Sequence, residues 1–266
     1  MLVIIKGAGD LASGIALRLW HCGFKIIMTD LYNPTSIRRT VCFSEAIRLG
    51  KMQVEDAVGV FAKNDQEILN IINKNQIAVI ADPSASVISR IPPDVVVDAI
   101  IAKTNLGTNI TEAPLVIGVG PGFTAGEDCH AVIETQRGHN LGKVIFNGSA
   151  APNSGIPGNI SGFTTERVLR APKAGVFQEL HHIAETVSAG DIVGYVDNEP
   201  VVAQITGTIR GLLPTGTIVS KGMKSGDIDP RCNIDHCYTV SDKARSIGGG
   251  VLEAILISFP VIKENK

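Results

Sequence analysis

The chain has 266 residues, of which 24 are lysine or arginine and 26 are aspartate or glutamate, giving a formal net charge of −2. At roughly 150 residues per domain, this length predicts about two domains, each long enough to bury a core of its own. The slight negative charge argues against non-specific binding to nucleic acid, which requires a basic face. No apolar run approaches the roughly 18 residues that span a bilayer, and no signal-peptide pattern is visible, so we expect a cytoplasmic protein without membrane segments.

The first residues follow the order strand, glycine turn, helix, second strand. The apolar run 1–6 leads into a turn that reads G-x-G-x-x-A, and a second strand, 25–29, ends at an acidic residue. In such a turn the glycines let a pyrophosphate approach the backbone, the helix offers N–H groups to phosphate, and the acid binds a ribose hydroxyl. The expected cofactor-binding residues are Gly7, Ala8, Gly9, Asp10, Leu11, Ala12 and Asp30.

The same turn also fits a strand–helix connection whose small residues serve only packing. Asp10 lies inside the turn, where its charge would repel a pyrophosphate unless it caps the helix. Arg38 and Arg39 suit either a 2′-phosphate or the solvated start of a helix, so NAD and NADP both remain candidates.

Strands and a helix continue to alternate up to residue 101. We predict them at 56–62 (strand), 65–73 (helix), 77–80 (strand) and 95–101 (strand). Asp82 and Lys103 follow two of these strands and should emerge at the carboxyl edge of the sheet, where ligands bind in open α/β sheets. Both are candidate catalytic residues, although Asp82 is equally a turn former before proline and Lys103 equally an ordinary exposed lysine.

A second glycine-rich loop follows the strand predicted at 115–119. Its glycines, Gly120, Gly122 and Gly126, would form an anion-binding loop, but the acids at 127 and 128 weaken that expectation. A hairpin predicted from 129 to 146 carries His130 and Glu134 on one face. His130 is a candidate for acid–base chemistry, the alternative being a cross-strand polar pair, and two such residues without a third ligand predict no metal site.

The composition divides the chain into two domains joined by a linker. Residues 151–164 contain clustered proline and glycine and predict the linker, so we expect domains at 1–150 and 165–266. In the second domain, residues 171–194 align with 203–226 at a constant offset of 32, with seven identities. The repeat resembles biotinyl and lipoyl carrier domains, but the turn at 197–200 lacks the lysine that carries the cofactor. We therefore expect a binding or docking module rather than a carrier.

Two further features lie near the C-terminus. Cys232, His236 and Cys237 form a short cluster whose C-x4-C spacing differs from that of zinc ribbons, and Cys232 is a candidate reactive residue. A helix predicted from Ser241 contains three consecutive glycines, 248–250, which cost about 1 kcal/mol each relative to alanine. Another domain, a second subunit in a homo-oligomer or a ligand must therefore approach this helix closely.

Motifs along nearly the whole chain together resemble one family, the accessory proteins of the selenium-dependent molybdenum hydroxylase system, of the YqeB type. The motifs are Lys6-Gly-Ala-Gly-Asp-Leu-Ala12, Asp98-Ala-Ile-Ile-Ala-Lys-Thr-Asn-Leu-Gly107, Gly120-Pro-Gly-Phe-Thr-Ala-Gly126, Val132-Ile-Glu-Thr-Gln-Arg-Gly-His139, Gly226-Asp-Ile-Asp-Pro-Arg231 and Ser241-Asp-Lys-Ala-Arg245. The resemblance implies a role in maturing these enzymes, with a client hydroxylase or its cofactor as partner. It assigns no reaction, and so leaves open whether the chain is an enzyme.

The sequence thus predicts an α/β chain with a Rossmann-like parallel sheet domain, followed by a β-rich barrel-sandwich domain and a C-terminal helix. The leading function is a maturation protein that binds NAD(P) or a molybdopterin nucleotide. The alternatives are an NAD(P)-dependent oxidoreductase of a small substrate, with Lys103 or His130 as acid–base residue, and a scaffold without activity.

Overall fold

The computed structural model describes residues 1–260, and the chain divides into two compact units, each built from separate stretches of sequence. Among the described residues, unit 1 contains Met1–Pro34, Phe43–Asn153 and 240–260, whereas unit 2 contains Thr35–Cys42 and Ser154–Thr239. This division differs from the predicted one in two places. Residues 35–42 join the second unit, and the C-terminal helix joins the first.

The strands of unit 1 form a nine-stranded sheet. Their bounds are β1 Leu2–Lys6, β2 Lys25–Asp30, β3 Lys51–Val54, β4 Ala57–Phe61, β5 Ile77–Ala81, β6 Val95–Asp98, β7 Leu115–Val119, β9 Ala131–Ile133 and β10 Val144–Ile145. The order across the sheet is β10-β9-β7-β6-β1-β2-β5-β4-β3. The strands from β9 to β4 in this order are parallel, and β10 and β3 pair antiparallel at the two edges. The central strands are short apolar runs, as expected for strands covered on both faces.

The parallel register puts Ile4, Ile27, Ala78, Val96 and Val116 on one face of the sheet. Helices α3 Asp65–Asn73 and α4 Val87–Arg90 pack over part of this face through isoleucines and Val87. The rest of this face is covered by Phe123 and Ala125, in and before β8 Thr124–Ala125, and by Ala150, which follows β11 Gly148–Ser149. A helix-free stretch therefore completes one layer of unit 1.

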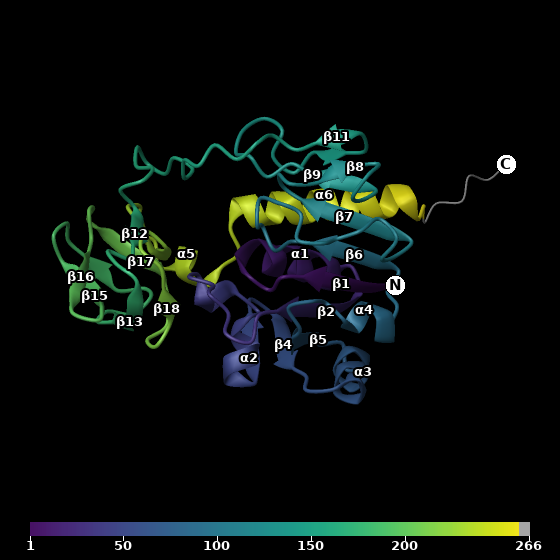
Figure 1. The fold of residues 1–266 in the computed structure, drawn as a ribbon, viewed down its shortest axis with the longest axis horizontal. Helices are drawn as coiled ribbons and strands as arrows, with labels where there is room; N and C mark the ends of the chain where they lie inside the picture. The colour runs from purple at the N-terminus through teal and green to yellow at the C-terminus, as the bar shows by residue number, and fades with distance from the viewer. Residues whose placement is uncertain (261–266) are drawn as a thin grey trace. The chain divides into compact units, whose positions relative to one another are not determined.

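Helices α1 Asp10–His21 and α6 Asp242–Ser258 lie side by side (Figure 1), and α6 also contacts β7, β9 and β10. Glycines make the helix contact close. A Cβ at Gly14 would lie 2.6 Å from the Ala244 Cβ, and one at Gly248 would lie 3.1 Å from the carbonyl oxygen of Gly14. The neighbour expected at the glycine-rich helix is thus α1 of the same chain.

Unit 2 consists of two four-stranded antiparallel sheets with the helix α5 Asp235–Tyr238, the 3-10 turn η1 Arg39–Val41 and connecting loops. The strands are β12 Val168–Arg170, β13 Gly175–Glu179, β14 Thr186–Val187, β15 Ile192–Val196, β16 Glu199–Val202, β17 Gly207–Leu212, β18 Ile218–Val219 and β19 Lys224–Asp229. The sheets have the orders β12-β19-β17-β14 and β16-β15-β13-β18. Adding 32 to the residue numbers of β12, β13, β14 and β15 gives, within one or two residues, β16, β17, β18 and β19. The two members of each pair lie in different sheets, so the sequence repeat is a structural repeat.

The predicted fold class, a Rossmann-like parallel sheet followed by a barrel-sandwich domain and a C-terminal helix, is wrong. The large sheet is mixed, because a two-residue turn at Glu55 and Asp56 folds β3 back on β4 and the 131–145 hairpin adds β10 at the other edge. Helix α6 follows the second domain in the sequence but belongs to unit 1, where it packs on α1. Unit 2 has two separate antiparallel sheets and takes residues 35–42 from the first part of the chain.

The remaining secondary structure of unit 1 is the short helix α2 Glu45–Leu49. Within residues 1–260, no helix combines the length and the apolar character needed to cross a membrane.

Candidate functional site

The carboxyl edge of the parallel strands collects most of the residues predicted to bind a ligand. Strand β1 has β2 on one side and β6 on the other, and the chain leaves β1 toward β2 through α1. In open α/β sheets the crevice at such a change of direction is the usual ligand site. Gly7 follows β1 directly and Asp30 is the last residue of β2, so both lie beside this point.

The glycine turn adopts a conformation that needs glycine at its first position. Gly7 has φ +92°, and a Cβ there would lie 3.0 Å from the carbonyl oxygen of Ala99, in the loop after β6. Gly9 is the N-cap residue of α1 and has no side chain with which to cap the helix. The first N–H groups of a helix have no partner within the helix, so this end suits an anion.

Asp30 supports the turn directly. Its Oδ2 accepts the N–H of Ala8 at 2.8 Å, and its Oδ1 accepts the N–H of Leu31 at 2.7 Å. Burial raises the pKa of the Asp30 carboxyl, and the two N–H donors oppose that shift only in part. Each carboxylate oxygen has a second lone pair, so Asp30 can accept a ligand hydroxyl while holding the turn.

A buried polar network next to the turn was missed by sequence reasoning. The Nζ of Lys6 lies 2.8 Å from Thr108 Oγ1 and 2.7 Å from both carboxylate oxygens of Glu112. Thr108 in turn donates to Asp98 Oδ2 at 2.6 Å. These bonds fix the long loop between β6 and β7 beside Gly7. The available signal was Lys6 itself, a charged residue at the end of a buried strand.

Lys103 lies in that loop, exposed and with φ +69°. The loop passes close to the second glycine loop, because a Cβ at Gly122 would lie 2.7 Å from the Cα of Thr104. The glycine at 122 is therefore required by the neighbouring backbone as well as by its own φ of +109°.

The second glycine loop uses several of its N–H groups internally. Gly120 donates to the carbonyl oxygen of Ile133 at 2.9 Å, and Gly126 donates to that of Cys129 at 2.8 Å. The N–H of Thr124 donates to the carboxylate of Asp128 at 2.8 Å. Two of the three glycines predicted to bind an anion thus already have carbonyl partners, and a carboxylate of the chain occupies part of the loop.

Asp82 has a structural role at the end of β5. It accepts the N–H of Val87 at 2.8 Å and the hydroxyl groups of Ser84 and Ser86, just before α4. Burial acts to raise the pKa of Asp82, but these donors outweigh it and hold the pKa below its usual value. Of the two roles predicted for Asp82, the turn-forming one accounts for all these contacts.

His130 and Glu134 do not form the predicted pair. The Nδ1 of His130 accepts the N–H of Val116 at 3.0 Å. Glu134 is buried, and its two oxygens accept the N–H groups of Gln136 at 2.7 Å and Ala151 at 2.8 Å. Both side chains therefore satisfy backbone donors rather than each other.

Three of the five cysteines are buried, Cys42, Cys129 and Cys237. Burial raises the pKa of Cys129 to about 11 and also raises the pKa of Cys237. Cys232 is exposed, with φ +53°. In the part of the chain that the structure describes, no group of three or more histidine, cysteine or acidic side chains is arranged to hold a metal ion.

The loop around Cys232 instead belongs to a charge network in unit 2 that the sequence did not reveal. Asp227 and Asp229, each about 1% exposed, alternate along β19. Arg167 and Arg210 pair with Asp227, and Arg231 donates to both oxygens of Asp229 at 2.9 and 2.6 Å. Burial acts to raise the pKa of Asp229, but Arg231 and the charge of Arg210 lower it to about 2.

Arg38 and Arg39 also make their contacts within unit 2. Arg38 donates to the carbonyl oxygens of His236 and Thr239 at 2.8 and 3.0 Å. Arg39 donates to the carbonyl oxygen of Leu212 at 2.7 Å and pairs with Glu179. Neither of the roles predicted for these arginines, a 2′-phosphate contact or a solvated helix start, describes these bonds.

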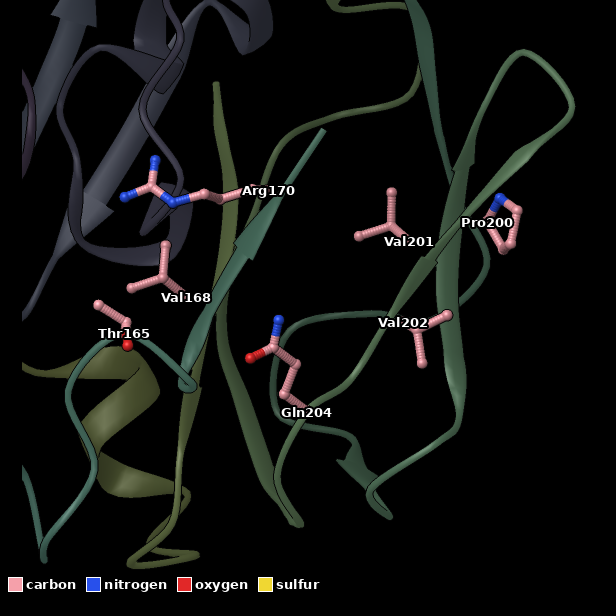
Figure 2. A pocket seen from close by; sticks show the side chains of 7 residues that line it. All are labelled: Thr165, Val168, Arg170, Pro200, Val201, Val202 and Gln204. Carbon is pink, nitrogen blue, oxygen red and sulfur yellow. The ribbon is translucent and has the colours of Figure 1, made fainter. Parts of the chain in front are cut away.

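Unit 2 also has a shallow pocket of about 470 Å³ between β12 and β16 (Figure 2). Val168 and Arg170 line it from β12, and the residues 32 positions later, Pro200 and Val202, line it from β16. Arg170 is the one titratable residue among those that line the pocket, and it donates to the carbonyl oxygen of Gly222 at 2.9 Å. The pocket therefore lacks a pair of groups for acid–base chemistry.

The N-terminal end of α6 brings a further cation toward α1. Lys243 is half-buried and lies within electrostatic range of Asp10, Glu134, Arg137 and Asp242. Burial and the charge of Arg137 lower the pKa of Lys243, against the opposing effect of the three acids. Lys243 and Arg137 both lie in motifs that the sequence analysis singled out, but nothing in their separation of more than 100 residues indicated that the charge of Arg137 acts on Lys243.

No protein-family model matches the chain. Over 256 residues it is 50% identical to the uncharacterized protein YqeB of Escherichia coli strain K12. The match covers 96% of this chain but 47% of that protein, so the chain spans about half the length of this curated relative. The YqeB-type resemblance is thus supported at the level of sequence, and the relative's name assigns no function.

Two solved structures show weak likeness. One is a succinylglutamate desuccinylase/aspartoacylase from Rhodobacter sphaeroides, with 20% identity and a TM-score of 0.21 over 24% of this chain and 21% of that one. The other is an aspartoacylase family protein from Mesorhizobium loti, with 13% identity and a TM-score of 0.28 over 85% and 84% of the two chains. Scores this low support no argument about fold or activity.

Proposed function

We propose that the chain binds the nucleotide part of a cofactor, either NAD(P) or a molybdopterin nucleotide, through Gly7–Ala12 and Asp30. One observation carries the proposal: a glycine N-cap begins α1 beside a strand-end carboxylate, at the point where the order of the parallel strands reverses direction. A pyrophosphate would lie against the first N–H groups of α1, and a ribose hydroxyl would donate to Asp30.

The biological role follows from the motif resemblance. We propose that the bound cofactor serves the maturation of selenium-dependent molybdenum hydroxylases, with the client enzyme or its cofactor as partner. In cells that lack this protein, such an enzyme should accumulate with less molybdenum per polypeptide, measured by elemental mass spectrometry on the purified client. A normal molybdenum content would contradict this role without bearing on nucleotide binding.

The binding itself can be tested by calorimetric titration of the purified chain with NAD(H), NADP(H), ATP and molybdopterin nucleotides. We expect at least one of them to bind, and Asp30→Asn to weaken the ribonucleotide by about tenfold or more, the effect of one hydrogen bond to a charged group. Because Asp30 also holds Ala8, the 2′-deoxy form of the ligand is the essential comparison.

If Asp30 contacts the ribose, Asp30→Asn should remove most of the preference for the ribonucleotide over its 2′-deoxy form. Asp65→Asn, at an exposed aspartate paired with Arg90, is the matched control and should change neither affinity. Failure of every nucleotide to bind would overturn the proposal. Turnover of a reduced nicotinamide with a small carbonyl compound would instead favour the oxidoreductase alternative.

A further inference from the structure

The pocket of unit 2 lies between two edge strands. Strand β12 ends one sheet and β16 ends the other, so within residues 1–260 each has a strand neighbour on one side only, β19 and β15 respectively. The repeat relates the two edges, because Val168 and Arg170 in β12 correspond to Pro200 and Val202 in β16. An edge strand presents unpaired N–H and C=O groups along its open side, and these groups can pair with a further strand.

The hydrogen bonds between β12 and β19 show which residues of β12 face the open side. The carbonyl oxygen of Arg167 accepts the N–H of Ile228 at 2.8 Å, and the N–H of Ala171 donates to the carbonyl oxygen of Met223 at 2.9 Å. The extra residue at the register shift lies in β19, so the alternation along β12 is unbroken. Bonds to one neighbour alternate along an antiparallel strand, so the even-numbered residues of β12 direct their backbone groups away from β19.

Val168 and Arg170 are these even-numbered residues, and both line the pocket (Figure 2). The N–H of Val168 already donates to the carbonyl oxygen of Thr165 at 3.0 Å. The open side of β12 therefore offers the carbonyl oxygen of Val168, followed by the N–H and the carbonyl oxygen of Arg170. One donor between two acceptors is what a short added strand requires, since it supplies the complementary groups at the same spacing.

Strand β16 forms the other side of the pocket and is less suited to pairing. Pro200 has no N–H, and a proline on an edge strand is a common obstacle to further pairing. Val202 is 42% exposed and adds apolar surface. We therefore expect an added segment to bond to β12 and to contact β16 through side chains.

Arg170 gives the groove its charge. Its side chain is exposed and donates to the carbonyl oxygen of Gly222 at 2.9 Å, but no acidic side chain of the described residues pairs with it. None of the residues that line the pocket is acidic. A second copy of the chain, pairing β12 with its own β12, would bring two Arg170 side chains together, and like charges on paired strands are destabilising. The charge favours a partner that carries an acid.

We propose that the open edge of β12 binds an extended segment of a partner protein, which adds to the sheet as a strand. An aspartate or glutamate of that segment pairs with Arg170, and its apolar side chains contact Pro200 and Val202. The segment is short, because β12 has three residues and a strand of that length spans about 10 Å. This binding site is independent of the nucleotide site proposed for unit 1.

The first experiment selects binders to the full chain from a phage-displayed library of random heptapeptides. We expect the enriched peptides to share an acidic residue with apolar, β-branched neighbours. Arg170→Met should fail to enrich them, whereas Lys63→Met, at an exposed lysine of unit 1, should enrich the same peptides as the wild type. Equal urea midpoints of Arg170→Met and the wild type would show that the variant is folded.

The second experiment measures the affinity of the most enriched peptide by fluorescence anisotropy. Arg170→Met should weaken binding by about tenfold or more, the effect of one hydrogen bond to a charged group, and Arg170→Lys should retain part of the affinity. Replacing the acid of the peptide by its amide should weaken binding to the wild type but not to Arg170→Met. N-methylation of the peptide backbone should weaken binding at alternate positions only, because a strand paired on one side uses every second N–H.

Three results would overturn the proposal. The first is that no peptide is enriched, and the second is that the enriched peptides bind Arg170→Met as well as they bind the wild type. The third is that N-methylation has no alternating effect, since this would exclude strand addition. Sedimentation equilibrium tests the competing occupant: a wild-type dimer that the peptide dissociates would assign the edge of β12 to a second copy of the chain and contradict the proposal.

Discussion

At the scale of single residues, the buried carboxylates Asp227 and Asp229 hold together the largest network of ion pairs described in unit 2, and its cysteines take no part in these pairs. Asp229 is surrounded by Arg231, Arg210 and His236, and Arg210 also reaches Asp227. The pairs with Arg231 and Arg210 stabilise the fold only while the Asp229 carboxylate is ionised. Removing the charge would leave the arginines without their counter-ions, which costs about 3 kcal/mol or more for a buried pair.

This gives unit 2 a specific dependence on pH. The pKa of Asp229 is about 2 in the folded chain against 3.8 as the ordinary value, so its contribution to stability is complete above pH 4 and is lost as pH falls toward 2. Urea unfolding between pH 6 and pH 2.5 should show this loss. Asp229→Asn should be less stable at pH 6 and should lose less on acidification, whereas Asp235→Asn, an exposed neighbour, should follow the wild type. An unchanged acid slope in Asp229→Asn would contradict the assignment.

Residue-level reasoning from the sequence reached only part of the candidate site. Gly7 and Asp30 were found because a glycine turn and a strand-end acid are local patterns. The partners of Lys6 lie more than 100 residues away, and Ala244 meets Gly14 only because the helices α1 and α6 pack together. His130 was misread for a related reason: period two put it on one face with Glu134, but backbone N–H groups were better partners for both.

At the scale of elements, three consecutive glycines in α6 have different surroundings. A Cβ on Gly250 would collide with the carbonyl oxygen of Gly142, and one on Gly248 would press on α1, whereas nothing lies within 4 Å of a Cβ on Gly249. The sequence correctly predicted a close neighbour at this helix, but it could not identify α1 because the contact depends on where the helix folds back.

Alanine substitutions at neighbouring positions should therefore have opposite effects. Gly249→Ala should raise the free energy of unfolding by up to about 1 kcal/mol, because alanine favours the helix and meets nothing. Gly250→Ala should lower it by about 1–3 kcal/mol, because the rigid backbone of Gly142 must move. Urea unfolding of the two variants and the wild type measures both changes, and a stabilised Gly250→Ala would show that α6 does not pack as described.

At the scale of the whole molecule, linear domain boundaries failed because both units are discontinuous. Residues 35–42 follow β2 in the sequence but bond to unit 2, where Leu212 donates its N–H to the carbonyl oxygen of Ile37 at 2.7 Å. Composition predicted a linker at 151–164 because proline and glycine cluster there, and the division between the units falls after Asn153. Composition could not show that residues 35–42, which we call the strap, belong to unit 2, because eight residues are too few to carry a compositional signal of their own.

The strap should contribute measurably to the stability of unit 2. A chain in which residues 35–42 are joined by a glycine–serine linker to the front of 154–239 should unfold at a higher urea concentration than 154–239 alone. The strap supplies hydrogen bonds from Arg38 and Arg39 as well as the contact at Ile37, each contributing about 1 kcal/mol. Within the linked chain, Arg39→Met removes the bond to Leu212 and the pair with Glu179, so it should return part of the gain, while Lys221→Met, at an exposed lysine, should not. Equal stability of the linked and unlinked chains would mean that residues 35–42 are not part of this unit.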